Sequence, residues 1–206
     1  MSIVAEKNAE TELTSINKTD LLVQLYEVME QMPFEESSVF TKGPYLFGAN
    51  AGMVGLIGNS LCRRLFRVRQ AKFQSLVTMS TLPFLVTTPA YFHAISIPLL
   101  TGSLSSKNEA MVRGGTIAVL CSGLLPLALA LPLNIMLAKR FGTVRLPEQG
   151  KWAVWGSVLR PLLIQMSAVG LMQCAFAVYL ASEQFRVNNK VQEMYLQPKS
   201  WAQTTD

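Results

Sequence analysis

The sequence predicts an all-α polytopic membrane protein with four transmembrane helices. Half of the 206 residues are hydrophobic and only 15% are charged, whereas about 25% of the residues in a typical soluble domain are charged. Charged residues are absent from four runs of 20, 34, 25 and 22 residues: 43–62, 73–106, 114–138 and 161–182. Because about 20 apolar helical residues cross a bilayer core, each run is long enough for one span.

Three segments follow from this pattern. Residues 1–42 form an acidic N-terminal segment, residues 43–186 the four-helix transmembrane domain, and residues 187–206 a polar C-terminal tail. The spans are expected at about 45–62, 73–97, 114–138 and 161–182.

The acidic segment contains one amphipathic helix, predicted over residues 19–32. Its apolar side chains recur at steps of three and four residues: Leu21, Leu22, Leu25, Val28, Met29 and Met32. Pro33 ends the pattern. The polar positions are acidic or neutral, whereas a helix on anionic lipid would carry Lys or Arg there. We therefore expect it to pack against loops of this chain or against a partner.

The first and fourth spans each carry a stripe of small and polar residues. In the first span the stripe is Gly48, Gly52, Gly55, Asn59 and Cys62, and in the fourth it is Ser167, Gly170, Cys174, Ala177 and Ala181. Helices associate in lipid through close backbone approach and interhelical hydrogen bonds. The two stripes are therefore expected to form helix-packing faces and to pack together.

The second and third spans are predicted to be kinked by interior prolines, which remove a backbone hydrogen bond. The second run contains Pro83, Pro89 and Pro98, and the third contains Pro126 and Pro132. A run of 34 residues exceeds one upright span. We expect a kinked helix followed by an extended segment through Pro98 and Gly102, with a helix, a break and a half-helix as the alternative.

Basic residues gather in the first and third connections. Ten of them lie near the predicted membrane there: Arg63, Arg64, Arg67, Arg69, Lys72, Lys139, Arg140, Arg145, Lys151 and Arg160. The positive-inside rule places these connections on the inner side and both termini on the opposite side.

The five basic residues of the first connection, in RRLFRVRQAK, allow three interpretations. They can orient the protein as a membrane-flanking loop, bind anionic lipid such as cardiolipin, or meet an acidic partner surface. Nucleic acid is not expected, because these basic residues lie beside the predicted membrane.

No motif predicts a catalytic, cofactor-binding or metal site, so the protein is not expected to be an enzyme. The spans contain no Asp, Glu, Lys or Arg, and the chain has a single histidine, His93. Such a histidine is expected at a hydrogen-bonded helix interface. The three cysteines, Cys62, Cys121 and Cys174, are too widely spaced for a CxxC motif and are interpreted as packing residues.

Five blocks resemble the transmembrane protein 126 family in order and spacing: GLIGNSLCRRLFRV, PFLVTT, SIPLLTGSL, PLALALPLN and YLASEQF. The resemblance runs from about Asn50 to Phe185. It implies a mitochondrial inner-membrane protein that helps to assemble the membrane arm of respiratory complex I. Its implied partners are membrane-arm subunits and other assembly factors, and no cofactor or catalytic residue is implied.

Together these observations give the hypothesis of a holdase-like scaffold. Its glycine stripe in the first span and its proline-bent helices would present packing faces to nascent hydrophobic subunits, and its loops or N-terminal helix would recruit soluble factors. In the inner membrane, the positive-inside rule would place the termini in the intermembrane space. Recruitment of matrix factors through the termini would require the opposite orientation.

Two rival functions remain open. A small-solute transporter or channel would need polar groups that converge near the midplane. Its candidates are Asn50, Asn59, Thr87, Thr88 and Asn134. A membrane enzyme has less support from the sequence.

Overall fold

The computed structural model describes residues 20, 22–143 and 152–196, and within them the chain is helical with no β-strand. Residues 22–30 form a first helix. It is followed by α2 (Phe34–Thr41), α3 (Gly43–Leu65), α4 (Lys72–Tyr91), η1 (Phe92–Ser96), α5 (Ile97–Leu100), α6 (Lys107–Ile117), η2 (Ala118–Leu124), α7 (Leu125–Phe141) and α8 (Trp152–Leu196). The predicted basic residues Arg145 and Lys151, and the ends of the chain, lie outside the described residues.

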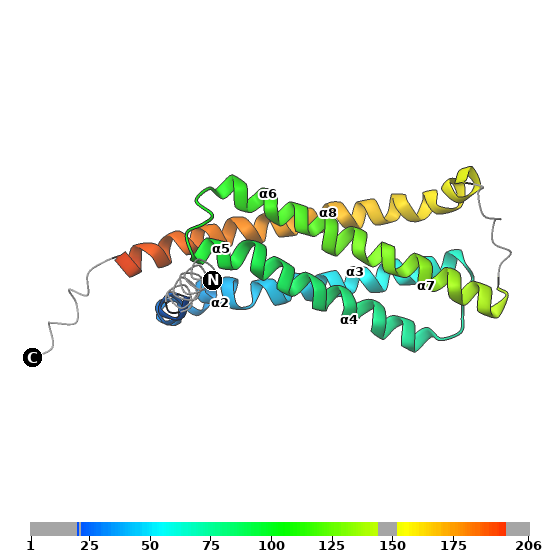
Figure 1. The fold of residues 1–206 in the computed structure, drawn as a ribbon, viewed down its shortest axis with the longest axis horizontal. Coiled ribbons are helices and arrows are strands. Elements are labelled where there is room, and N and C mark those ends of the chain that lie inside the picture. The colour runs from blue at the N-terminus through cyan, green and yellow to red at the C-terminus, as the bar shows by residue number, and fades with distance from the viewer. Residues whose placement is uncertain (1–19, 21, 144–151, 197–206) are drawn as a thin grey trace, which may run out of the picture.

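Four long helical rods lie side by side (Figure 1). The rods are α3, then α4 with η1 and α5, then α6 with η2 and α7, and finally α8. Helix α3 packs along α4 and also contacts α7 and α8, while α6 packs along α8. Consecutive rods run in opposite directions, so the connections alternate between the two ends of the bundle.

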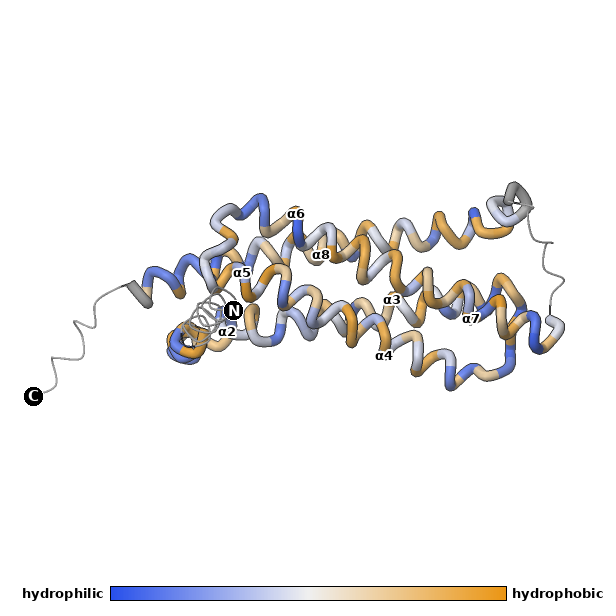
Figure 2. Tube along the Cα trace, in the orientation of Figure 1, coloured by the Kyte–Doolittle hydropathy of each residue, from blue (hydrophilic) through white to orange (hydrophobic). Residues whose placement is uncertain are grey.

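Three of the described helices are long and apolar enough to cross a membrane: Lys72–Leu100, Lys107–Phe141 and Trp155–Met194. Their hydrophobic residues extend along the rods, and hydrophilic residues concentrate toward the ends (Figure 2). Helix α3, with 23 residues, lies in the same bundle. Its glycines and asparagines make it less apolar than the other three, and the fourth predicted span stays a prediction.

Two of the five prolines of the second and third rods coincide with changes in helix type, whereas Pro83, Pro89 and Pro132 lie inside α-helices. Pro98 and Pro126 each stand near the start of an α-helix, directly after the π-helical segments η1 and η2. The wider π turn accommodates a residue that has no N–H to donate. The expected extended segment through Pro98 is therefore wrong, because the helix continues to Leu100. Whether these helices are kinked stays a prediction.

The N-terminal helix lies across one end of the bundle, where Figure 1 shows the chain near α2 almost end-on. Its predicted apolar face is turned inward: Leu25 and Met29 are fully buried, and Met32 is nearly so. Leu22 and Val28 pack against the same cluster, and Leu21 lies outside the described residues. Helix α2, which the sequence reasoning missed, continues this cap after Pro33.

The C-terminal helix extends beyond the predicted end of the fourth span at residue 182. Helix α8 has 45 residues and reaches Leu196, so the beginning of the predicted polar tail is helical. Val187 and Val191 are fully buried in the core cluster that also holds Leu25 of the cap. This last part of α8 therefore belongs to the packed core.

Candidate functional site

The glycine stripe of α3 is a contact face for α4. A Cβ on Gly52 would lie 2.7 Å from the carbonyl oxygen of Ser80, and one on Gly55 would overlap the carbonyl oxygen of Met79. A Cβ on Gly48 would overlap the hydroxyl of Thr88. Because two of these three obstacles are backbone atoms, the helices approach as closely as glycine permits.

The expectation that the stripes of α3 and α8 pack together is wrong. On α8, Ala177 and Cys174 face glycines of α6: a Cβ on Gly114 would lie 3.0 Å from the carbonyl oxygen of Ala177, and one on Gly115 3.4 Å from Cys174 Sγ. The spacing of a stripe identifies a packing face but does not identify its neighbour.

Helix α3 reaches α8 through residues outside the two predicted stripes. A Cβ on Gly43 would lie 3.0 Å from Leu180, and one on Gly58 3.4 Å from Met166. The two helices also share the hydrogen bond from Asn50 Nδ2 to the side-chain oxygen of Gln173, which is 3.3 Å long.

The other half of the α8 stripe is open. Ser167 is exposed, and a Cβ on Gly170 would meet no atom within 4 Å. The exposed apolar residues Leu163, Ile164, Leu171 and Met172 surround these positions. The first half of α8 thus presents an uncovered face of small and apolar side chains.

Asparagine side chains join three helices near the first connection. Asn134 Nδ2 of α7 donates to Asn59 Oδ1 of α3 at 2.9 Å, and Asn59 Nδ2 donates to Ser75 Oγ of α4 at 3.2 Å. Arg63 Nη1 reaches the same Ser75 oxygen at 3.1 Å, and its Nη2 donates to the carbonyl of Gln70 at 2.8 Å. All four side chains are buried, so they form a polar cross-link in an otherwise apolar core.

Buried glutamines of α8 provide the corresponding links toward the other end. Gln184 Nε2 donates to the carbonyl of Val39 at 3.1 Å, while Ser96 Oγ donates to Gln184 Oε1 at 3.2 Å. Gln173 pairs with Asn50, as described above, and both glutamines are fully buried. Sequence reasoning missed both, although Gln173 lies inside the charge-free run 161–182, where a glutamine is a recognisable signal for an interhelical hydrogen bond.

The cap adds aromatic contacts at this end. The ammonium group of Lys42 lies 4.2 Å from the ring centroid of Phe34, within the range of a cation–π contact. Burial raises the pKa of the Tyr26 hydroxyl, and the electrostatic interaction with nearby Tyr45 raises it further.

The basic connection contains residues in two different environments. Arg63 is only 8% exposed and serves the polar cross-link, whereas Arg64, Arg67, Arg69 and Lys72 are exposed. The chain turns after α3 with Arg67 at a φ of 52°. The N–H of Val68 donates to Arg63 O and that of Arg67 to Arg64 O, which is the Schellman pattern that glycine usually completes.

The two ends of the bundle differ in charge. Every acidic residue that the structure describes lies on or beside the capped end: Asp20, Glu27, Glu30, Glu35, Glu36, Glu109, Glu183 and Glu193. The opposite end, called the basic end below, carries Arg63, Arg64, Arg67, Arg69, Lys72, Lys139, Arg140 and Arg160. The ion pairs between described residues, Glu109–Arg113, Glu183–Arg186 and Glu36–Lys190, all lie toward the capped end.

The transporter candidates form separate contacts inside the bundle. Asn50 pairs with Gln173 and Asn59 with Asn134, while Thr87 Oγ1 donates to the carbonyl of Cys121 at 3.3 Å. The buried hydroxyl of Thr88 has no partner among the described residues. These contacts connect different helix pairs.

The remaining candidates for chemistry are also placed by the structure. His93 is exposed, its ring lies edge-on to Phe92, and it makes no hydrogen bond with a described residue. It is therefore not the hydrogen-bonded interface residue that was expected. Cys62, Cys121 and Cys174 are free thiols. Within the described ranges, no three His, Cys, Asp or Glu residues are grouped as metal ligands.

The fold and its apolar rods define an α-helical membrane protein, and comparison with known sequences identifies its family. The family profile described as Transmembrane protein 126 matches residues 20–198. The chain belongs to this family.

Curated relatives carry two names. Transmembrane protein 126A of Rattus norvegicus is 34% identical over 180 residues, covering 86% of this chain and 92% of the relative. The Homo sapiens protein of that name is 34% identical over 175 residues, covering 84% and 90%. Complex I assembly factor TMEM126B, mitochondrial, of Homo sapiens is 29% identical over 126 residues, covering 61% and 54%. No solved structure matches the chain.

Proposed function

We propose that this chain is a non-enzymatic assembly factor of the mitochondrial inner membrane that helps to build the membrane arm of respiratory complex I. Family membership carries the proposal, because relatives of the B type are named mitochondrial complex I assembly factors. The chain would hold membrane-arm subunits together with other assembly factors.

The part of the open α8 face from Ser167 to Met172 is the surface that suits a membrane client. In lipid, helices associate by packing and hydrogen bonding rather than by hydrophobic drive. Ser167 and Gly170 leave room for close approach on this face. The glycines of α3 do not, because α4 already covers them. This assignment changes the scaffold hypothesis, in which the α3 stripe presented the client face.

The proposal includes four membrane crossings, with α3 as the first. Helix α3 has 23 residues and is therefore about 35 Å long, enough to cross a hydrocarbon core. Its last turn carries Arg63 and Arg64 beside the basic connection. By the positive-inside rule, the basic end faces the matrix, and both termini face the intermembrane space.

The exposed basic residues of the first connection suit contact with anionic lipid such as cardiolipin. Arg64, Arg67, Arg69 and Lys72 remain available for such a contact, whereas Arg63 is occupied inside the bundle.

Single cysteines in an otherwise cysteine-free protein test the orientation. Lys72→Cys and Lys107→Cys place exposed thiols at the basic and the capped end, respectively. In intact mitoplasts, an impermeant maleimide should label position 107 and reach position 72 only after permeabilisation. The reverse pattern would contradict the proposed orientation.

The function itself is tested by removing the protein from cells and resolving mitochondrial complexes on native gels with mass spectrometry. We expect incomplete membrane-arm intermediates of complex I to accumulate, and the wild-type chain to restore the mature complex. In mild detergent, the protein should co-migrate with those intermediates. If it migrates alone and complex I assembles normally without it, the proposal fails. Solute uptake by proteoliposomes would then test the transporter alternative.

A further inference from the structure

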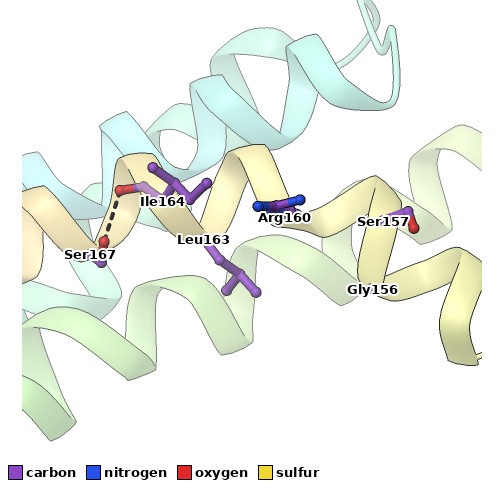
Figure 3. A pocket seen from close by; sticks show the side chains of 6 residues that line it. All are labelled: Gly156, Ser157, Arg160, Leu163, Ile164 and Ser167. Carbon is purple, nitrogen blue, oxygen red and sulfur yellow. Dashed lines mark hydrogen bonds between the residues drawn. The ribbon is translucent and has the colours of Figure 1, made fainter.

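An open groove of about 610 Å³ runs along the first half of α8. It is lined by Gly156, Ser157, Arg160, Leu163, Ile164 and Ser167, and Figure 3 shows these residues along one stretch of the helix. The cation lies toward the basic end, with the two aliphatic side chains deeper along the rod. Ser167 Oγ donates to the carbonyl of Ile164 at 2.8 Å and thus turns back onto its own helix.

The guanidinium of Arg160 has no ion pair or hydrogen bond with a described residue. None of the described acidic residues lies at this end of the bundle, where Arg160 is one of eight described cations. The groove therefore combines apolar side chains with a positive charge that no described residue neutralises. Its occupant must supply a negative charge and a hydrophobic chain.

A second, smaller groove repeats this chemistry on α3. It measures about 300 Å³ and is lined by Leu56, Ile57, Ser60, Leu61 and Arg64. Gly58 of α3 and Met166 of α8 lie at the same level along the bundle, because a Cβ on Gly58 would lie 3.4 Å from the Met166 side chain. Arg64 lies six residues after Gly58, and Arg160 six residues before Met166, so each is about 9 Å further toward the basic end.

Two arginine-headed apolar grooves at one depth match the layout of a lipid leaflet, in which the phosphates lie in one plane and the acyl chains extend inward. A docked transmembrane helix would not require a cation at the same depth on a second helix.

We propose that the α8 groove is a binding site for an anionic phospholipid of the surrounding membrane. The phosphate binds Arg160, and an acyl chain lies against Leu163 and Ile164. The α3 groove with Arg64 is a weaker site of the same kind. The inference depends on insertion of the chain in a bilayer and not on its proposed role with complex I.

Native mass spectrometry of the full-length protein, released from nanodiscs that contain cardiolipin and phosphatidylcholine, tests the site. We expect the wild type to retain cardiolipin preferentially, and Arg160→Gln to weaken its retention about tenfold. Arg64→Gln should have a smaller effect. Lys107→Gln, an equal loss of charge at the capped end, should have none.

A steric variant tests the groove independently of charge. A Cβ on Gly156 meets no atom within 4 Å, so Gly156→Leu should leave the thermal stability unchanged while it narrows the groove and lowers cardiolipin retention. Equal retention by the wild type and Arg160→Gln would overturn the proposal, as would equal retention of cardiolipin and phosphatidylcholine. A protein dimer that excludes lipid from α8 would overturn it as well.

Discussion

The glycine face of α3 and the open half of α8 look alike in sequence but differ in use. On α3, Gly52 and Gly55 meet backbone carbonyls of α4, whereas Gly170 of α8 meets no atom within 4 Å. The same pattern thus builds the bundle at one place and leaves a free surface at another. A stripe of small residues indicates that another helix can approach closely. Only the fold shows whether that helix belongs to the same chain.

Helix α8 repeats this contrast along its own length. Ala177 is buried against α6, and Val187 lies in the core under the cap. The half that begins at Trp155 is largely uncovered and includes exposed Leu171. A client or lipid therefore has one accessible part of this helix and one inaccessible part.

The largest expected effect comes from Gly55→Leu. The new side chain would overlap the carbonyl of Met79, so α3 and α4 must separate. Overpacking a core costs about 1–3 kcal/mol and occasionally more, and we expect the upper end because the obstacle is backbone. Thermal unfolding in detergent measures the loss.

Gly170→Leu is the matched control for that variant. It adds the same side chain to a transmembrane glycine whose Cβ position is open. The change in unfolding free energy should stay within about 0.5 kcal/mol, as at other surface positions. Equal destabilisation by the two variants would contradict the assignment of the two faces.

Leu25→Ala tests the closed end of α8. Leu25 is fully buried in the cluster that contains Val187 and Val191. Truncation of a buried leucine costs about 2–5 kcal/mol, and the lower end is expected because the cap lies at the edge of the bundle. Limited proteolysis should show faster cleavage in residues 20–42 than in the wild type. Unchanged cleavage would mean that the cap does not depend on this contact.

Asn59→Leu removes the centre of the polar cross-link at the end of the glycine face. Ser75 and Asn134 lose one hydrogen-bond partner each, but they keep Arg63 and the Ala130 carbonyl, respectively. Each lost bond should therefore cost about 0.5–1.5 kcal/mol. In a double-mutant cycle with Asn134→Leu, the coupling energy should be about 0.6–1.7 kcal/mol. Additive effects of the two substitutions would show that the bond between the asparagines contributes nothing.

Glu36→Gln has the smallest expected effect. Its carboxylate pairs with Lys190 of α8, whose side chain is 45% exposed. Exposed ion pairs contribute about 0.2–1 kcal/mol, and the loss should shrink at high salt. Thermal unfolding at low and high ionic strength separates this contribution from packing, and a loss independent of salt would contradict it.

The sequence predicted the features that depend on local pattern. Charge-free runs predicted the three helices that are long and apolar enough to cross a membrane. The spacing of Leu25, Met29 and Met32 predicted the buried face of the N-terminal helix. The family was also predicted from motif order, and the family profile confirms it.

The features that the sequence did not predict depend on three-dimensional neighbours. Nothing in the spacing of Gly55 distinguishes α4 from α8 as its partner. Pro98 led to the prediction of an extended segment. The π turn that lets the helix continue through this proline cannot be predicted from composition. Gln173 and Gln184 donate hydrogen bonds to backbone carbonyls on other helices, and the sequence does not show which helices lie beside them.

The central claim is that the open half of α8, and not the glycine face of α3, meets the membrane client. A photo-crosslinking residue at position 171 and another at position 52, introduced separately and activated in intact mitochondria, test it directly. The account predicts that position 171 crosslinks to membrane-arm subunits of complex I and that position 52 crosslinks only within this chain. Crosslinks to those subunits from position 52, with none from position 171, would contradict it.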